Sequence, residues 1–183
     1  GIWLMPISPS PSYHGYDVTD YYGINPQYGT LEDFKRFLAE AQRRGIRVVV
    51  DLLLNHSSSE HPQFTRALRG DPKYRDWYLF VPPEQVPRTR GPWDQQVWQK
   101  MNDQFYYGIF WSGMPDLNYR NPAVTAEAYR IAEFWLRDVG VDGFRLDHVA
   151  RLLGRSTEEI HADPCLPRHH LGVAAPGGHQ RLV

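Results

Sequence analysis

The sequence predicts an α/β fold whose β-strands run parallel. Apolar runs at residues 1–7 and 46–55, and a shorter one at 143–149, are typical of strands buried in a sheet. Two segments with helical periodicity lie between them. Because strand, helix and strand are joined by short connections, neighbouring strands are expected to be parallel.

The first helical segment has clear start and stop signals. Thr30 is a suitable N-cap, and Asp33 stands where it completes a capping box. Apolar residues recur at helical spacing as far as Ala41, and Gly45 provides the stop. The sequence therefore predicts a helix over residues 31–44.

The second helical segment begins with Asn121 as N-cap and Pro122 in the first turn, and Gly140 closes it. An apolar stripe is expected to face the core; it consists of Val124, Ala128, Ile131, Trp135 and Leu136.

Two stretches do not fit the strand–helix rhythm. Residues 56–118 are rich in Pro, Asp and aromatics without sustained periodicity, which indicates an irregular insertion between a strand and the following helix. Residues 155–183 have neither period nor core-forming pattern, so we expect a disordered or frame-shifted tail. The cysteine and histidines of this tail fit no zinc-binding spacing.

Composition limits the classes of partner that the protein is expected to bind. A net charge of −1 gives no general attraction to nucleic acid, and no apolar run reaches membrane-spanning length, so neither partner is expected. The single cysteine excludes an internal disulfide. Localisation stays open.

Arg145 and Asp147 form the first polar cluster. Side chains alternate along a strand, so both face the same side. A guanidinium favours the ionised form of a neighbouring carboxylate, as a nucleophile requires. Taken alone, such a pair is more often a structural ion pair.

Two further clusters accompany the other strands. Asp51 and Asn55 share a face of the second strand, with His56 just past its end, and Asp51 is expected to bridge to Arg145. The loop after the first strand contains Tyr13-His-Gly-Tyr-Asp17, in which Tyr16 is suited to contact the apolar face of a sugar or to serve as a buried core tyrosine.

Together these clusters resemble the α-amylase family, glycoside hydrolase family 13. The resemblance is carried, in family order, by His14-Gly-Tyr-Asp17, by Asp51-Leu-Leu-Leu-Asn-His56, by Met114-Pro-Asp-Leu-Asn118 and by Gly143-Phe-Arg-Leu-Asp147. It implies a partial (β/α)8 TIM barrel, with an irregular domain B inserted between the third strand and the third helix. Amylase- and neopullulanase-like members are the most similar.

The resemblance also implies roles for individual residues. Asp147 is expected to be the nucleophile of a retaining mechanism on α-1,4-linked glucans or maltooligosaccharides, with Arg145 as the residue that holds it charged. The expected substrate-binding set comprises Tyr16, His14, His56 and Asp51. Asn55 and Asp116 match positions that help to hold calcium in some relatives, and no organic cofactor is implied.

The domain boundaries that follow are residues 1–55 for barrel strands two and three, 56–118 for domain B, 119–154 for the third helix and fourth strand, and 155–183 for the tail. We expect the chain to be a fragment. Glu158 and Glu159 lack the apolar surroundings of the family's general acid, and Ala150 and Arg151 replace a Lys-His pair of many relatives. The chain alone is therefore expected to be inactive.

Two alternatives stay open. An α-glucosidase or glucosyl-transferring isomerase of the same family often has Asp three residues before the stacking tyrosine, where this chain has Tyr13. A non-catalytic binding protein with the same barrel is disfavoured, because Asp147, Arg145, His56 and Tyr16 are all present.

Overall fold

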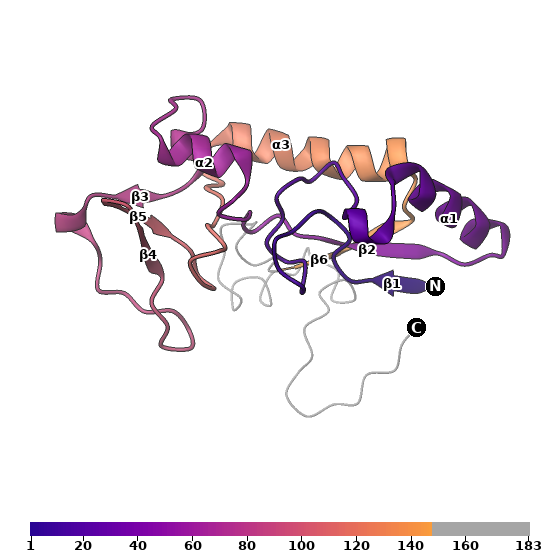
Figure 1. Ribbon diagram of the computed structural model, residues 1–183, viewed down its shortest axis with the longest axis horizontal. Coiled ribbons are helices and arrows are strands. Elements are labelled where there is room, and N and C mark those ends of the chain that lie inside the picture. Colours follow the sequence, from indigo (N-terminus) through magenta and orange to yellow (C-terminus); the bar gives the residue numbers. More distant parts are fainter. Residues whose placement is uncertain (148–183) are drawn as a thin grey trace, which may run out of the picture.

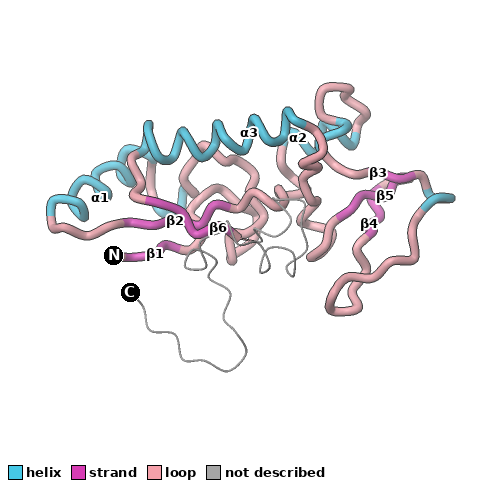
Figure 2. Tube along the Cα trace, turned by 180° about the vertical axis from the view of Figure 1, so that it is seen from behind, coloured by secondary structure: helices cyan, strands magenta, loops and turns pink. Residues whose placement is uncertain are grey.

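A computed structural model describes residues 1–147. Its centre is a three-stranded parallel sheet in the order β1 (Ile2–Leu4), β2 (Val48–Leu52) and β6 (Gly143–Leu146). In Figure 1, α1 (Leu31–Arg43) and α3 (Pro122–Glu133) run along one side of this sheet, and the reverse view in Figure 2 agrees. The predicted parallel strand–helix–strand arrangement is confirmed.

Helix α1 forms where its signals predict. The Thr30 hydroxyl accepts from the Asp33 amide at 3.1 Å, and the Asp33 carboxylate accepts from the Thr30 amide at 2.8 Å, which completes the capping box. Gly45 follows with φ of +72°, a conformation that glycine adopts without strain.

Helix α3 begins as expected but ends differently. The Asn121 side chain caps it through the Ala123 amide at 2.9 Å. From Phe134 to Val139 the chain continues as a π-helical turn, closed by left-handed Gly140. The wider turn carries the apolar stripe onto Trp135 and Val139, which are buried, so the expected burial of Leu136 is wrong.

Alternation along β2 separates the two faces of the parallel sheet. Val48, Val50 and Leu52 are buried in the core against α1 and α3, whereas Val49 and Asp51 belong to the opposite face. The helix-covered face is thus a hydrophobic core, and the opposite face presents polar groups.

The first strand is shorter and more exposed than its sequence predicts. Residues Ile2–Leu4 form β1, and Ile2, Trp3 and Met5 are all exposed. The expectation of a strand buried on both faces is therefore wrong for the described residues. The reason is its edge position: β1 pairs with β2 alone among the strands of residues 1–147.

The insertion has more regular structure than predicted. It contains α2 (Pro62–Leu68) and an antiparallel sheet of β3 (Phe80–Val81), β5 (Gln104–Tyr107) and β4 (Trp98–Met101), in that order. This sheet lies at the far end of the molecule from α1 (Figure 1). The aromatic core of the insertion consists of Phe64, Tyr74, Trp77, Tyr78 and Tyr106.

Two expectations remain, one about membrane-spanning segments and one about the tail of the chain. None of the helices within residues 1–147 combines the length and apolar character needed to cross a membrane. The predicted tail over residues 155–183 lies outside the described residues.

Candidate active site

The register of the parallel sheet brings the two strand-borne clusters together. Asp51 on β2 stands directly opposite Arg145 on β6. Arg145 donates from Nη1 to Asp51 Oδ2 at 3.0 Å, as predicted, and its Nη2 lies 3.4 Å from Asp147 Oδ1. One guanidinium therefore holds two carboxylates, one on each side of it.

Burial and charge act against each other in this cluster. The Asp51 side chain has 0 % exposure, and burial raises its pKa while bonds from Trp3 and Arg145 partly offset that rise. Burial opposes the charge of Arg145 too, but attraction to Asp51 and Asp147 prevails and raises the pKa of its guanidinium. Arg145 therefore stays cationic beside Asp147.

Trp3 also belongs to this cluster, a role that its sequence position does not predict. Its Nε1 donates to Asp51 Oδ1 at 2.6 Å, and its ring centroid lies 5.0 Å from the guanidinium carbon of Arg145. The signal in the sequence was weak, because a tryptophan in an apolar run is usually a core residue.

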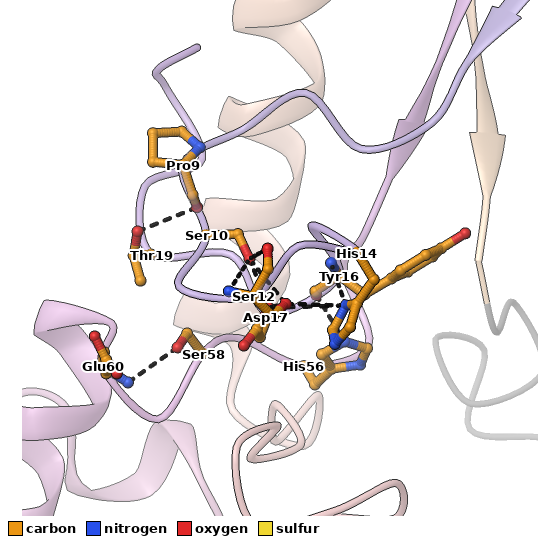
Figure 3. A network of polar contacts seen from close by, with 10 residues as sticks. All are labelled: Pro9, Ser10, Ser12, His14, Tyr16, Asp17, Thr19, His56, Ser58 and Glu60. Atoms are coloured by element: carbon orange, nitrogen blue, oxygen red, sulfur yellow. Dashed lines mark hydrogen bonds and ion pairs between the residues drawn. The ribbon is translucent and has the colours of Figure 1, made fainter. Parts of the chain in front are cut away.

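The loop after β1 has its own polar network (Figure 3). The carboxylate of Asp17 is buried and accepts from Ser10 at 2.5 Å and from Ser12. Ser12 Oγ in turn lies 3.0 Å from His14 Nδ1, which also accepts from the Tyr16 amide at 3.1 Å. Since a backbone N–H can only donate, neutral His14 carries its proton on Nε2.

Gly15 makes this loop possible. It has φ of +79°, and a Cβ built there would lie 2.9 Å from the Pro6 Cβ. The tight backbone that glycine permits here brings the rings of His14 and Tyr16 near each other, with centroids 5.9 Å apart.

His56 is buried between the loop and domain B. Its Nε2 lies 3.0 Å from the Tyr16 carbonyl and its Nδ1 lies 3.3 Å from the Asn55 amide nitrogen, so Nε2–H donates and Nδ1 accepts. Its ring also meets Phe110 edge-on. Both nitrogens of His56 are therefore engaged within the protein, and a contact with a sugar hydroxyl stays a prediction.

A cavity of about 420 Å³ joins these parts. The loop after β1 contributes His14 and Tyr16, and Asp147 follows the end of β6. The segment of residues 56–118 contributes His56, Phe110, Trp111 and Met114. Asp51 and Arg145 are not among the lining residues. Arg145 contacts the Asp147 carboxylate, and Asp51 in turn contacts Arg145. The cavity mixes one carboxylate with aromatic and imidazole rings, a composition suited to a sugar.

Phe110 and Trp111 belong to an aromatic-rich run of residues 106–113, of which one or two rings are expected to reach substrate. Sequence alone does not show which rings of this run line the cavity. Their position depends on a loop that packs against His56, and periodicity says nothing about such a loop.

The predicted calcium residues lie close together but do not form a recognisable metal site. Residues His56 and Asp116 are bridge partners, and the Leu117 amide donates to the Asn55 carbonyl at 2.9 Å. Asp116 Oδ1 accepts from the Ile109 amide at 3.0 Å, and every buried side-chain polar atom of the described residues has a partner. No group of three carboxylate, histidine or cysteine side chains within residues 1–147 has metal-binding geometry. Calcium stays a prediction, and no step below depends on it.

The comparisons with known proteins agree on one family. The model of the alpha amylase catalytic domain matches residues 1–180. Alpha-amylase 3 of Dictyoglomus thermophilum is 44% identical over 160 residues, covering 87% of this chain and 31% of that protein. An oligo-1,6-glucosidase of Parageobacillus thermoglucosidasius is 37% identical over 171 residues, covering 89% of this chain and 30% of that protein.

A solved structure gives the same result for the fold. The α-amylase from H. orenii superposes with a TM-score of 0.74 at 52% identity, over 82% of this chain and 31% of that one. The chain thus spans about a third of the length of the relatives it matches. Its parallel sheet and helices are part of an α-amylase-type TIM barrel, and the chain belongs to the α-amylase family of glycoside hydrolases, family 13.

Proposed function

We propose that the complete protein containing this chain is a retaining glycoside hydrolase that cleaves α-1,4-linked glucans or maltooligosaccharides. The observation that carries the proposal is the position of Asp147 on the wall of the cavity, with Arg145 Nη2 at 3.4 Å from its carboxylate. A carboxylate beside the bound sugar, paired with a guanidinium, is the nucleophile that a retaining mechanism requires.

In the proposed reaction, one Asp147 oxygen attacks the anomeric carbon and the bond to the leaving-group oxygen breaks. A second carboxylic acid protonates that oxygen, and water later releases the sugar from Asp147 with net retention of configuration. Among the described residues that line the cavity, Asp147 is the one carboxylate. The acid must therefore come from outside residues 1–147.

The rings of the cavity have a matching role. Tyr16 is half-buried at the cavity wall, and Phe110 and Trp111 line it from domain B. Aromatic faces contact the C–H surface of a sugar, while His14 offers its Nε2–H to a hydroxyl. We assign Tyr16 as the platform beneath the sugar at the cleavage point.

An exo-acting glucosidase or a glucosyl-transferring isomerase is the second candidate, and the identity to an oligo-1,6-glucosidase supports it. One observation favours cleavage within longer chains. The position three residues before Tyr16 is occupied by Tyr13, which is 99% exposed and is not among the residues that line the cavity. No carboxylate at that position closes the cavity around a chain end.

Replacement of Asp147 tests the proposal. In the complete protein, Asp147→Asn keeps the shape but removes the charge, and we expect kcat on maltoheptaose to fall by roughly 10⁴-fold or more. The matched control is Asp138→Asn, because Asp138 is an exposed aspartate outside the cavity. Unchanged turnover by Asp147→Asn would refute the nucleophile assignment. Products from maltoheptaose distinguish the two candidates, since internal cleavage gives mixed oligosaccharides and exo cleavage gives glucose first.

A further inference from the structure

Trp3 occupies an unusual position for a tryptophan with 51% of its surface exposed. It lies on β1, on the face of the sheet that carries Asp51, and its indole N–H donates to Asp51 Oδ1 at 2.6 Å. The other oxygen, Oδ2, accepts from Arg145 at 3.0 Å. The two oxygens of Asp51 are thus each held by a donor from a different neighbouring strand.

Trp3 also contacts the second member of the pair. The guanidinium carbon of Arg145 lies 5.0 Å from the centroid of the Trp3 ring, within the range of a cation–π interaction. Arg145 then reaches Asp147 at 3.4 Å. One indole therefore fixes Asp51 through its N–H and Arg145 through its ring face.

This double contact matters because Asp51 is buried. A carboxylate without solvent exposure stays ionised only if its oxygens receive hydrogen bonds. Arg145 supplies bonds to one oxygen, and Trp3 supplies the bond to the other. A neutral Asp51 would lose its ion pair with Arg145 and would no longer fix the position of the guanidinium.

We propose that Trp3 is a positioning residue for the nucleophile: it keeps Asp51 charged and oriented, and Asp51 in turn keeps Arg145 in contact with Asp147. Trp3 is not among the residues that line the cavity, so it acts through Asp51 and Arg145 and not through the substrate. The effect on catalysis rests on the proposed function, whereas the coupling between Trp3 and Asp51 does not.

The titratable and charged groups around Asp51 determine the direction of the pH effect. They are Arg145 from β6, Asp147 just past the end of β6, and Tyr16 from the loop after β1. Of these, Asp147 disfavours an anionic Asp51 and Arg145 favours it, whereas Tyr16, whose pKa is raised, is neutral in the pH range where Asp51 titrates. Loss of the indole donor removes a group that lowers the pKa of Asp51, so Asp51 takes up its proton at a higher pH. The acidic limb of kcat/KM is then expected to move to higher pH.

Trp3→Phe in the complete protein separates the N–H from the ring. Phenylalanine keeps an aromatic face beneath Arg145 and removes the donor. We expect kcat on maltoheptaose to fall roughly 10- to 100-fold, the range for loss of a hydrogen bond to a charged group, with KM little changed and the acidic limb raised. The matched control is Trp98→Phe on β4, where the ring packs against Tyr107 far from Asp51, and it should change neither quantity.

A double-mutant cycle tests whether Trp3 acts through Asp51. In an Asp51→Asn background, Trp3→Phe should cause little further loss. If Trp3→Phe costs the same factor in both backgrounds, or lowers kcat without moving the acidic limb, Trp3 is a structural residue and the proposal is wrong.

A readout independent of activity keeps the two proposals apart. In ¹⁵N-tryptophan-labelled complete protein, the indole N–H signal lost in Trp3→Phe should titrate with pH, and Asp51→Asn should abolish that titration. A signal that does not respond to Asp51→Asn overturns the positioning role. If the signal titrates as expected but Asp147→Asn is fully active, the coupling stands and the proposed function fails.

Discussion

At the scale of single residues, the site depends on polar groups whose partners come from distant parts of the chain. Asp51 and Arg145 are 94 positions apart, and Trp3 and Asp51 are 48 apart. Strand register alone brings them within hydrogen-bonding distance. The geometry of the candidate site is therefore a property of the sheet more than of any one motif.

Asp17 provides a prediction for the loop after β1. Its buried carboxylate accepts from Ser10 and Ser12, and Ser12 contacts His14. Asp17→Ala removes the acceptor of the Ser10 and Ser12 hydroxyls, so His14 and Tyr16 should lose their fixed orientation. We expect KM for maltooligosaccharides to rise by about 10-fold. Steady-state kinetics measure this, with Asp103→Ala in domain B as the control. An unchanged KM would show that the network does not position the loop.

His61 predicts how stability depends on pH. It is buried, its Nδ1 accepts from the Gln63 amide at 3.1 Å, and burial lowers its pKa to about 4. Unfolding returns the pKa to the ordinary value near 6.5, so the unfolded state binds the extra proton between these limits. The contribution of His61 to the free energy of unfolding is thus fully present above about pH 6.5. It decreases as the pH falls towards 4, by on the order of 3 kcal/mol.

His61→Asn tests this, because asparagine also caps a helix and does not titrate. Urea unfolding of the complete protein at pH 7 and pH 4.5 should show a smaller loss in the variant than in the wild type. Equal losses in both proteins would exclude His61 as the source.

At the scale of elements, α1 gives the clearest stability prediction. Thr30→Ala removes one half of the capping box with Asp33 and should lower the free energy of unfolding by about 1 kcal/mol. Thermal unfolding measures the change. Thr125→Ala, inside α3, is the matched control and should be neutral or slightly stabilising, because alanine is the better helix former. A control that loses as much as Thr30→Ala would mean that capping is not the cause.

The elements also show which features the sequence predicts and why. The caps at Thr30 and Asn121 depend on neighbours within three residues, so the local sequence predicts both. The exposure of Leu136 escaped prediction because a π-helical turn changes the angular spacing that the apolar stripe assumed. Strand β3 has two residues and owes its pairing to β5, which no local pattern reveals.

The candidate site divides in the same way. Alternation along the predicted strand of residues 143–149 placed Arg145 and Asp147 on one face, and in the structure they lie together although β6 ends at Leu146; parallel register places Asp51 opposite Arg145. The role of Trp3 is not predictable from sequence because it depends on a contact with a residue far along the chain, and the same dependence decides which ring of residues 106–113, here Phe110, lies against His56. Tyr16 and His14 were correctly placed together, since a five-residue motif contains both.

At the scale of the whole molecule, one carboxylate lines the cavity among the described residues. A retaining glycosidase needs two, and a general acid contributes roughly 10²–10⁴-fold to the rate. We therefore expect the isolated 183-residue chain to hydrolyse maltoheptaose at least about 100-fold more slowly than the complete protein. Reducing-sugar release at equal molar concentration compares them, and equal rates would contradict this account of the acid.

The most direct test of the central claim is to trap the covalent intermediate on Asp147. An α-maltosyl fluoride with a second fluorine at carbon 5 reacts with a retaining enzyme and leaves a slowly hydrolysed glycosyl ester. Mass spectrometry of the complete protein should then show one added maltosyl group, and peptide fragmentation should locate it on Asp147. A label on any other residue, or the release of products with inverted anomeric configuration, would contradict the assignment of Asp147 as the nucleophile.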